Sequence, residues 1–163
     1  MDQILIFSLD SRLFQNSAYE PLADRDFFRW RQAGYIIGLY GQAGRIEAKA
    51  NQLRLNLNLF FWLKEGHDSS QTLASFVEHL KQVARIDETG YQPEKVVVLS
   101  SEVTDYLAAR ALGLNFIAVC LSQAEADDFI RTGLPSSLII IKDKRLAKIS
   151  ADLNPLLLRF FLS

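Results

Sequence analysis

The sequence predicts an α/β fold, a three-layer α/β/α sandwich around a mostly parallel sheet of five or six strands. Short apolar runs rich in β-branched residues alternate with amphipathic helical segments along the chain. This alternation is typical of βαβ units with right-handed crossovers. The 163 residues suffice for one domain with a substantial core and are too few for two of ordinary size. We therefore expect a single domain over residues 1–163.

Composition argues against several classes of function. The formal net charge of −1 gives no general attraction to nucleic acid or to an anionic membrane, so neither is expected as a partner. No apolar run reaches the roughly 18 to 20 residues that span a bilayer. The single cysteine, Cys120, excludes an intramolecular disulfide. With no N-terminal signal segment in evidence, it favours a cytoplasmic location.

The first strand is expected at residues 4–7, where four apolar residues follow one another. A fully apolar run is typical of a strand buried on both faces of a sheet. A polar loop, residues 8–11, comes directly after it. Ligands of open α/β sheets bind at the carboxyl ends of the strands, so Ser8 and Asp10 are candidate site residues.

The remaining elements follow from periodicity, caps and turn residues. In the first half we expect a helix from about residue 24 to Gly34, a strand over 35–40, a helix over 45–55 and a strand over 57–63. In the second half we expect helices over 71–86, 106–112 and 123–132, and strands over 95–99, 115–121 and 137–141. A last helix is expected to start at Asn154-Pro155, because proline is tolerated in a first turn.

The C-terminal segment, residues 156–162, is more apolar than a helix covering one face of a sheet requires. Two explanations stay open. The helix is either sandwiched on two sides, or it forms an interface with a protein partner or a second copy of the chain.

The loop after the first strand carries a recognisable pattern, Phe7-Ser8-Leu9-Asp10-Ser11-Arg12-Leu13. It resembles the first motif of the haloacid dehalogenase-like (HAD) hydrolases, in which an apolar strand precedes Asp, any residue, Asp, any residue, and Thr or Ser. In that family the first Asp is the nucleophile and the second is the general acid/base. The resemblance places Ser8 at the nucleophile position, Asp10 at the acid/base position and Arg12 at the hydroxyl position.

A second stretch, residues 93–113, is similar to the fourth HAD motif and the helix after it. Asp105 matches the second acid of that motif. Ser100 and Ser101 stand where the family has Gly and a metal-binding Asp. Glu102 lies one position off, so it and Asp105 are weak candidates for metal ligands. The resemblance implies a Rossmann-like HAD fold, and the short spacing before the second strand implies that it has no cap.

The other two HAD motifs are altered as well. The second strand of the family ends in Thr or Ser, which binds the phosphoryl group, whereas here it ends at Tyr40, whose ring would fill that space. The third motif supplies a Lys, and the matching position, near Ser70, has none. Lys64 is the nearest candidate upstream.

These substitutions remove most of the groups that HAD phosphoryl transfer needs: an anionic nucleophile, a divalent cation held by carboxylates, and positive charge on the phosphoryl oxygens. Ser8 and Ser101 also remove two negative charges from a Mg²⁺ site. We therefore expect a pseudophosphatase without a cofactor or metal, which acts as a binding, scaffolding or regulatory module. The alternative is a divergent Mg²⁺-dependent phosphatase or phosphotransferase that uses Asp10 with Glu102 or Asp105.

Structural roles are also open to the candidate residues. Asp10 is favoured as a cap after a buried strand, and Asp105 as a helix N-terminal residue stabilised by the helix dipole. Arg12, Tyr40 and Ser101 are the candidate binding residues. For Arg12, an ion pair with Asp10 is favoured over an anionic ligand.

Overall fold

The computed structural model describes residues 2–14, 21–86, 90–142 and 149–161. Six strands form one sheet in the order β3-β2-β1-β4-β5-β6, and every neighbouring pair is parallel. The predicted α/β class and six-stranded sheet are confirmed. The strands are β1 (Ile4–Ser8), β2 (Ile36–Gln42), β3 (Trp62–Gly66), β4 (Val96–Ser100), β5 (Asn115–Cys120) and β6 (Ile139–Ile141).

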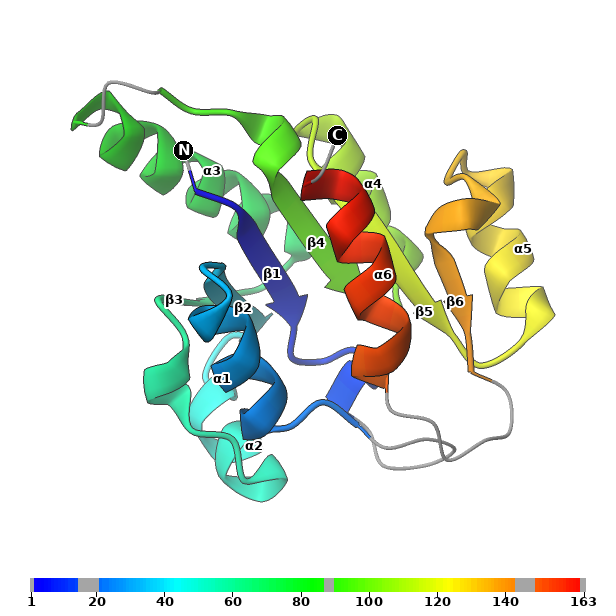
Figure 1. Ribbon diagram of the computed structural model, residues 1–163, viewed down its shortest axis with the longest axis horizontal. Helices are drawn as coiled ribbons and strands as arrows, with labels where there is room; N and C mark the ends of the chain where they lie inside the picture. The colour runs from blue at the N-terminus through cyan, green and yellow to red at the C-terminus, as the bar shows by residue number, and fades with distance from the viewer. Residues whose placement is uncertain (1, 15–20, 87–89, 143–148, 162–163) are drawn as a thin grey trace.

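Helices cover both faces of the sheet and complete three layers. One face is covered by α1 (Asp24–Gln32), α2 (Ile46–Leu53) and α6 (Ile149–Phe161), and the other by α3 (Ser69–Ile86), α4 (Val103–Ala111) and α5 (Gln123–Arg131). Figure 1 shows α1 and α6 in front of the sheet and α3 and α4 behind it. Because parallel strands are joined by crossovers, this placement buries the central strands on both sides.

The strand β1 lies at the centre and pairs with β2 on one side and β4 on the other. Its five residues are all buried. Leu5 and Phe7 face the layer of α1, α2 and α6, whereas Ile4 and Ile6 face the layer of α3, α4 and α5. An apolar residue is needed at every position of this strand, which is why its sequence does not alternate.

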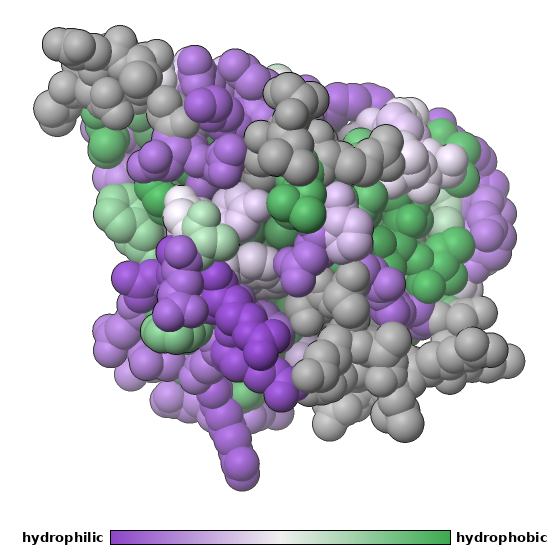
Figure 2. All heavy atoms as spheres, viewed as in Figure 1, coloured by the Kyte–Doolittle hydropathy of each residue, from purple (hydrophilic) through white to green (hydrophobic). Residues whose placement is uncertain are grey.

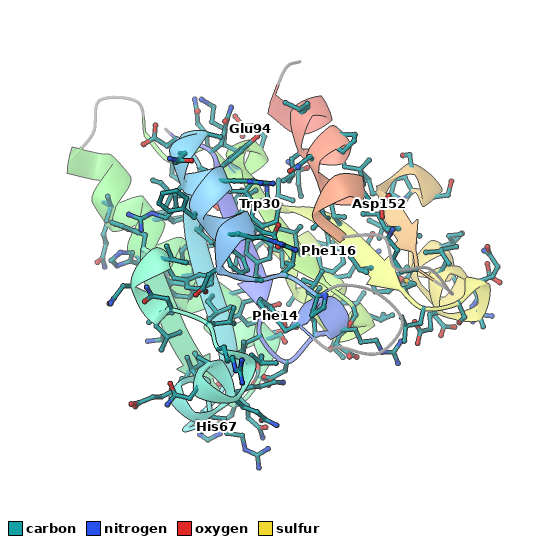
Figure 3. The ribbon with its side chains drawn as sticks, turned by 60° about the horizontal axis from the view of Figure 1, so that its bottom comes forward. Phe14, Trp30, His67, Glu94, Phe116 and Asp152 are labelled. Atoms are coloured by element: carbon teal, nitrogen blue, oxygen red, sulfur yellow. The ribbon has the colours of Figure 1, made fainter. Side chains whose placement is uncertain are left out.

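Aromatic rings pack α1 against the sheet. The ring of Phe27 meets the ring of Phe7 edge to face at 5.1 Å between centroids and lies 4.8 Å from that of Phe60. Trp30 stacks on Phe7 at 5.3 Å. The indole N–H of Trp30 also donates to Asn154 Oδ1 at 2.8 Å, so α1 and α6 are joined by a polar contact above the core. Figure 3 shows Trp30 between α1 and the sheet.

The third predicted strand is present, but the bounds predicted for it, residues 57–63, are wrong. Residues 57–59 form a short 3₁₀ turn, begun by Asn56, whose side chain accepts from the backbone N–H of Asn58 at 3.0 Å. Phe60 is then buried, Phe61 is 69% exposed, and the strand begins only at Trp62. Because β3 is an edge strand, charged residues in it stay exposed. Its sequence therefore has no continuous apolar run by which a strand would be predicted.

The start predicted for the last helix is also wrong. The helix α6 begins at Ile149, so Pro155 lies inside it. A proline in a helix interior removes one backbone hydrogen bond. The helix is nevertheless anchored before and after the proline, because Leu153 and Leu157 are both buried against the sheet.

The interface predicted at this helix stays a prediction. Leu158 is half exposed, whereas Leu162 lies outside the described residues. None of the described helices has the length and apolar character needed to cross a membrane. Figure 2 shows hydrophilic residues over α1 and α2 and an apolar area over β6, whose residue Ile141 is exposed.

Replacing Phe27 tests the aromatic packing. Phe27→Ala leaves a cavity among Phe7, Trp30 and Phe60, and we expect it to lower the free energy of unfolding by about 3–5 kcal/mol. The adjacent Phe28 is 53% exposed, so Phe28→Ala should cost less than about 1 kcal/mol. Urea denaturation of both variants measures the difference, and equal losses would contradict the packing described.

Candidate functional site

A cleft of about 300 Å³ opens at the carboxyl ends of the strands. It lies at the point where the strand order turns from β2 and β3 to β4 and β5, where ligands of doubly wound sheets bind. His67 marks this end of the molecule in Figure 3, and Glu94 lies at the opposite end of the sheet. The lining residues are Ser8, Asp10, Tyr40, Gly41, Gln42, Gly66, His67, Asp68, Ser69, Thr72, Glu102, Thr104 and Asp105.

Asp105 is the buried charge of the cleft, with 3% of its surface exposed. It lies in the first turn of α4, as predicted. One carboxylate oxygen accepts from the hydroxyl of Ser69 at the start of α3, and the other accepts from the hydroxyl of Ser100 at the end of β4. Ser100 Oγ also accepts from the backbone N–H of Glu102 at 3.1 Å. A single carboxylate thus joins three elements.

Asp10 has a similar role at the other side of the cleft. Its Oδ2 accepts from the backbone N–H of Gln42 at 2.8 Å, and its Oδ1 pairs with Lys49 Nζ at 3.1 Å. Asp10 was expected to cap its own turn. Its carboxylate instead binds the end of β2 and the helix α2.

The ion pair predicted between Arg12 and Asp10 is wrong. The hydroxyl of Ser11 donates to the carbonyl of Ser8 at 2.6 Å, and the short 3₁₀ turn that follows, Arg12–Phe14, contacts β5. The guanidinium of Arg12 pairs there with Glu125 of α5, while the carboxylate of Asp10 takes Lys49. Arg12 is not among the residues that line the cleft.

Ser101 likewise has a structural contact. Its hydroxyl accepts from the backbone N–H of Arg12 at 3.0 Å, which joins the loops after β1 and β4. Ser101 is not among the residues that line the cleft. Of the predicted candidates, Ser8, Asp10, Tyr40, Glu102 and Asp105 are brought together there, and Arg12 and Ser101 lie beside it.

Tyr40 ends β2 in register with Ser8 of β1, and it is 4% exposed. Its hydroxyl lies next to Ser8 and Asp105, with which it interacts, and it is shielded from solvent. Burial, followed by the negative charge of Asp105, raises the pKa of Tyr40 well above its ordinary value of 10.0. The phenol therefore stays protonated.

The lining carries four carboxylates, those of Asp10, Asp68, Glu102 and Asp105, and no Lys or Arg among the described residues. The helices α3 and α4 begin here, and helix N-termini attract anions. Each already has a carboxylate of its own. Asp68 Oδ1 accepts from the backbone N–H of Gln71 at 2.8 Å, and Asp105 lies in the first turn of α4. The cleft is therefore acidic.

Several residues of the site were missed by sequence reasoning. Asp68 and Ser69 follow β3, and the rule that places site residues after strands would have found them with correct bounds for that strand. Lys49 and Glu125 are far from their partners in sequence, and no local pattern indicates them.

Neither a scan against models of protein families nor a search of curated proteins finds a match. Among solved structures, a haloacid dehalogenase-like family hydrolase from Streptococcus pneumoniae is similar with a TM-score of 0.61 and 11% sequence identity. The similarity covers 95% of this chain and 98% of that chain. This chain has a haloacid dehalogenase-like fold. At such low identity the likeness concerns the fold alone, and it confirms the fold that the sequence motifs implied.

The residues of the cleft do not fit the Mg²⁺ site that the HAD resemblance implies. Ser8 and Ser101 supply no carboxylate, and Asp10 and Asp105 each have both oxygens bound to donors of the protein. In the described part of the chain, no three His, Cys, Asp or Glu side chains are grouped to hold a metal. Glu102 and the second oxygen of Asp68 remain, and they are too few for a cation that prefers several oxygen ligands.

Tyr40 gives the protein a specific sensitivity to alkaline pH. In the unfolded chain its phenol ionises near pH 10, whereas in the folded chain it stays protonated. The free energy of unfolding is therefore unaffected by this group below about pH 10. It falls as the pH rises further, by up to about 1.4 kcal/mol per pH unit, because only the unfolded chain gains by ionising the phenol. We expect Tyr40→Phe to lose less stability than the natural protein between pH 10 and 11. Urea denaturation at each pH measures this, and parallel declines would contradict it.

Proposed function

We propose that this chain is a HAD-like protein without phosphatase activity, retained as a binding or regulatory module. One observation carries the proposal: Asp10 and Asp105 each have both carboxylate oxygens engaged with donors of the protein. These carboxylates hold strands and helices together. A carboxylate so bound is a weak metal ligand, because a metal ion must compete with existing hydrogen bonds.

The side chain at the nucleophile position supports the same proposal. A serine hydroxyl is un-ionised at neutral pH and needs an adjacent base to attack phosphorus. The nearest acid along the chain, Asp10, is bound to Gln42 and Lys49. A phosphoserine, if formed at Ser8, would be an ester without the lability of an acyl phosphate, so turnover would stop after one event.

The charge of the cleft argues against a phosphate substrate. A transferring phosphoryl group is stabilised by cations, and the cleft lining holds four acids and no Lys or Arg among the described residues. Lys49 lies close by, but it is paired with Asp10. Like charges would therefore repel a phosphate ester.

A divergent metal-dependent hydrolase is the second candidate. It is favoured by one observation, that Asp10, Glu102 and Asp105 line the same cleft. Asp10→Asn separates the two candidates. The hydrolase loses any Mg²⁺-dependent activity with this change, whereas a binding module has no such activity to lose and only weakens an exposed ion pair worth at most about 1 kcal/mol.

Titration with Mg²⁺ tests the proposal directly. We expect no calorimetric Mg²⁺ binding and no hydrolysis of p-nitrophenyl phosphate or acetyl phosphate by the natural protein. Ser8→Asp adds a carboxylate beside Asp10 and Asp105, and we expect it to gain Mg²⁺ binding. Ser137→Asp adds the same charge at an exposed turn remote from the cleft and should gain none. Mg²⁺-dependent turnover by the natural protein would disprove the proposal.

A further inference from the structure

We infer that this chain forms a homodimer through the outer edge of β3, with the two β3 strands antiparallel about a two-fold axis at Leu63. β3 is the last strand on its side of the sheet (Figure 1), and no described strand pairs with its outer edge. A second copy paired there continues one sheet through both molecules. The inference concerns the edge of the sheet and not the cleft, so it does not depend on the proposed function.

The backbone of β3 leaves a regular set of hydrogen-bonding groups at this edge. Gly66 directs its carbonyl to β2, where it accepts from the N–H of Ala43 at 3.1 Å. Alternate residues of a strand direct their backbone groups to opposite sides. Lys64 therefore also directs its backbone to β2, whereas Leu63 and Glu65 direct theirs outward, and both are exposed. Such a row of outward groups is a template for another strand.

Apolar side chains border the same edge. Phe61, directly before the strand, donates its N–H to the carbonyl of Ile37 at 2.8 Å, yet its ring is the most exposed of the large apolar side chains described. Phe61 and the exposed Val83 of α3 line a mostly apolar hollow of about 100 Å³ on the α3 side of the edge. Leu63, 41% exposed, borders another hollow on the α2 side. Exposed apolar surface gathered in one place is typical of an interaction site.

Charge selects the register of the two strands. A two-fold axis perpendicular to the sheet keeps each side chain on its own face, so the axis passes through a residue and that residue lies opposite its own copy. An axis at Lys64 would place two ammonium groups opposite each other, and an axis at Glu65 two carboxylates, and like charges directly opposite are destabilising. An axis at Leu63 places two leucines opposite each other instead.

In the register centred on Leu63, Lys64 of one copy lies opposite Trp62 of the other. The ring of Trp62 packs on the α3 side, 4.1 Å from that of Phe76, and Lys64 is on the same face because side chains alternate. Residues whose backbone groups point away from the new strand form its non-hydrogen-bonded pairs, in which side chains are closer. The ammonium group therefore reaches the indole, the best aromatic partner of a cation.

A second copy is favoured over an unrelated strand because this edge supplies its own complement. The two-fold axis forms the contact between Lys64 and Trp62 twice and covers the exposed Leu63 of both copies. The formal net charge of −1 also leaves little repulsion between whole molecules.

Sedimentation of this chain from about 1 μM to about 1 mM tests the dimer, and we expect a monomer–dimer equilibrium. Leu63→Lys puts two ammonium groups at the two-fold axis, so it should weaken dimerisation about tenfold. Leu158→Lys makes the same substitution at a half-exposed leucine of α6. It serves as the matched control and should change the dissociation constant less than twofold.

Cysteine variants test the register by crosslinking. An axis at Leu63 brings the two Cα atoms of this residue to about 5.5 Å, a distance that a disulfide bridges. Leu63→Cys should therefore form a covalent dimer when it is oxidised with copper phenanthroline. Glu65→Cys should not, because its two copies lie about 14 Å apart along the strands. The natural protein, whose single cysteine is buried, is the control for Cys120.

Three results would overturn the inference. The first is a monomer at every concentration. The second is a dimer that Leu158→Lys weakens and Leu63→Lys does not, since such a dimer would form through α6. The third is crosslinking of Glu65→Cys in preference to Leu63→Cys, which would contradict the register. None of these measurements depends on phosphatase activity, so the proposed function and this inference fail separately.

Discussion

The buried carboxylate of Asp105 is the constraint on which the cleft depends. A buried charge is stable only where hydrogen bonds replace its hydration, and the hydroxyls of Ser69 and Ser100 supply them. These donors come from the start of α3 and the end of β4, whereas the acid comes from α4. Backbone hydrogen bonds pair the parallel strands and extend to the first loop residues, as from Ala43 N–H to Gly66 O, whereas the start of α3 is joined to α4 by side chains. Asp105 therefore fixes the β3–α3 loop against the β4–α4 loop with one group.

The two serines of the segment that resembles the fourth HAD motif have structural contacts of the same kind. The hydroxyl of Ser101 binds the backbone of Arg12, and the hydroxyl of Ser100 binds Asp105. A hydroxyl can donate and accept at once, so it satisfies neighbouring loops without bringing a charge. The loops around the cleft can thus keep their arrangement without the charged groups that phosphoryl transfer requires.

Central and edge strands differ in how well the sequence predicts them. β1 and β4 are buried at every position, so their apolar runs indicate both their type and their place. β3 pairs on one side only, and its exposed Lys64 and Glu65 break the apolar pattern. The apolar residues just before it, which suggested a strand, form a turn that buries Phe60. The start of α6 was missed because a helix held by buried leucines on both sides of Pro155 tolerates a residue that usually marks a beginning.

The site was predictable to the extent that it follows from strand ends. Ser8, Tyr40 and Asp105 lie where the rule for parallel sheets places them. The direction of Arg12 depends on a turn and on a partner, Glu125, that lies 113 residues further along the chain, and no local pattern specifies such a pair. Charge shows the same limit. A net charge of −1 suggests a neutral surface, yet the fold gathers four acids from separate loops into one cleft. The local charge of the cleft is therefore a property of the topology, and the composition of the chain does not predict it.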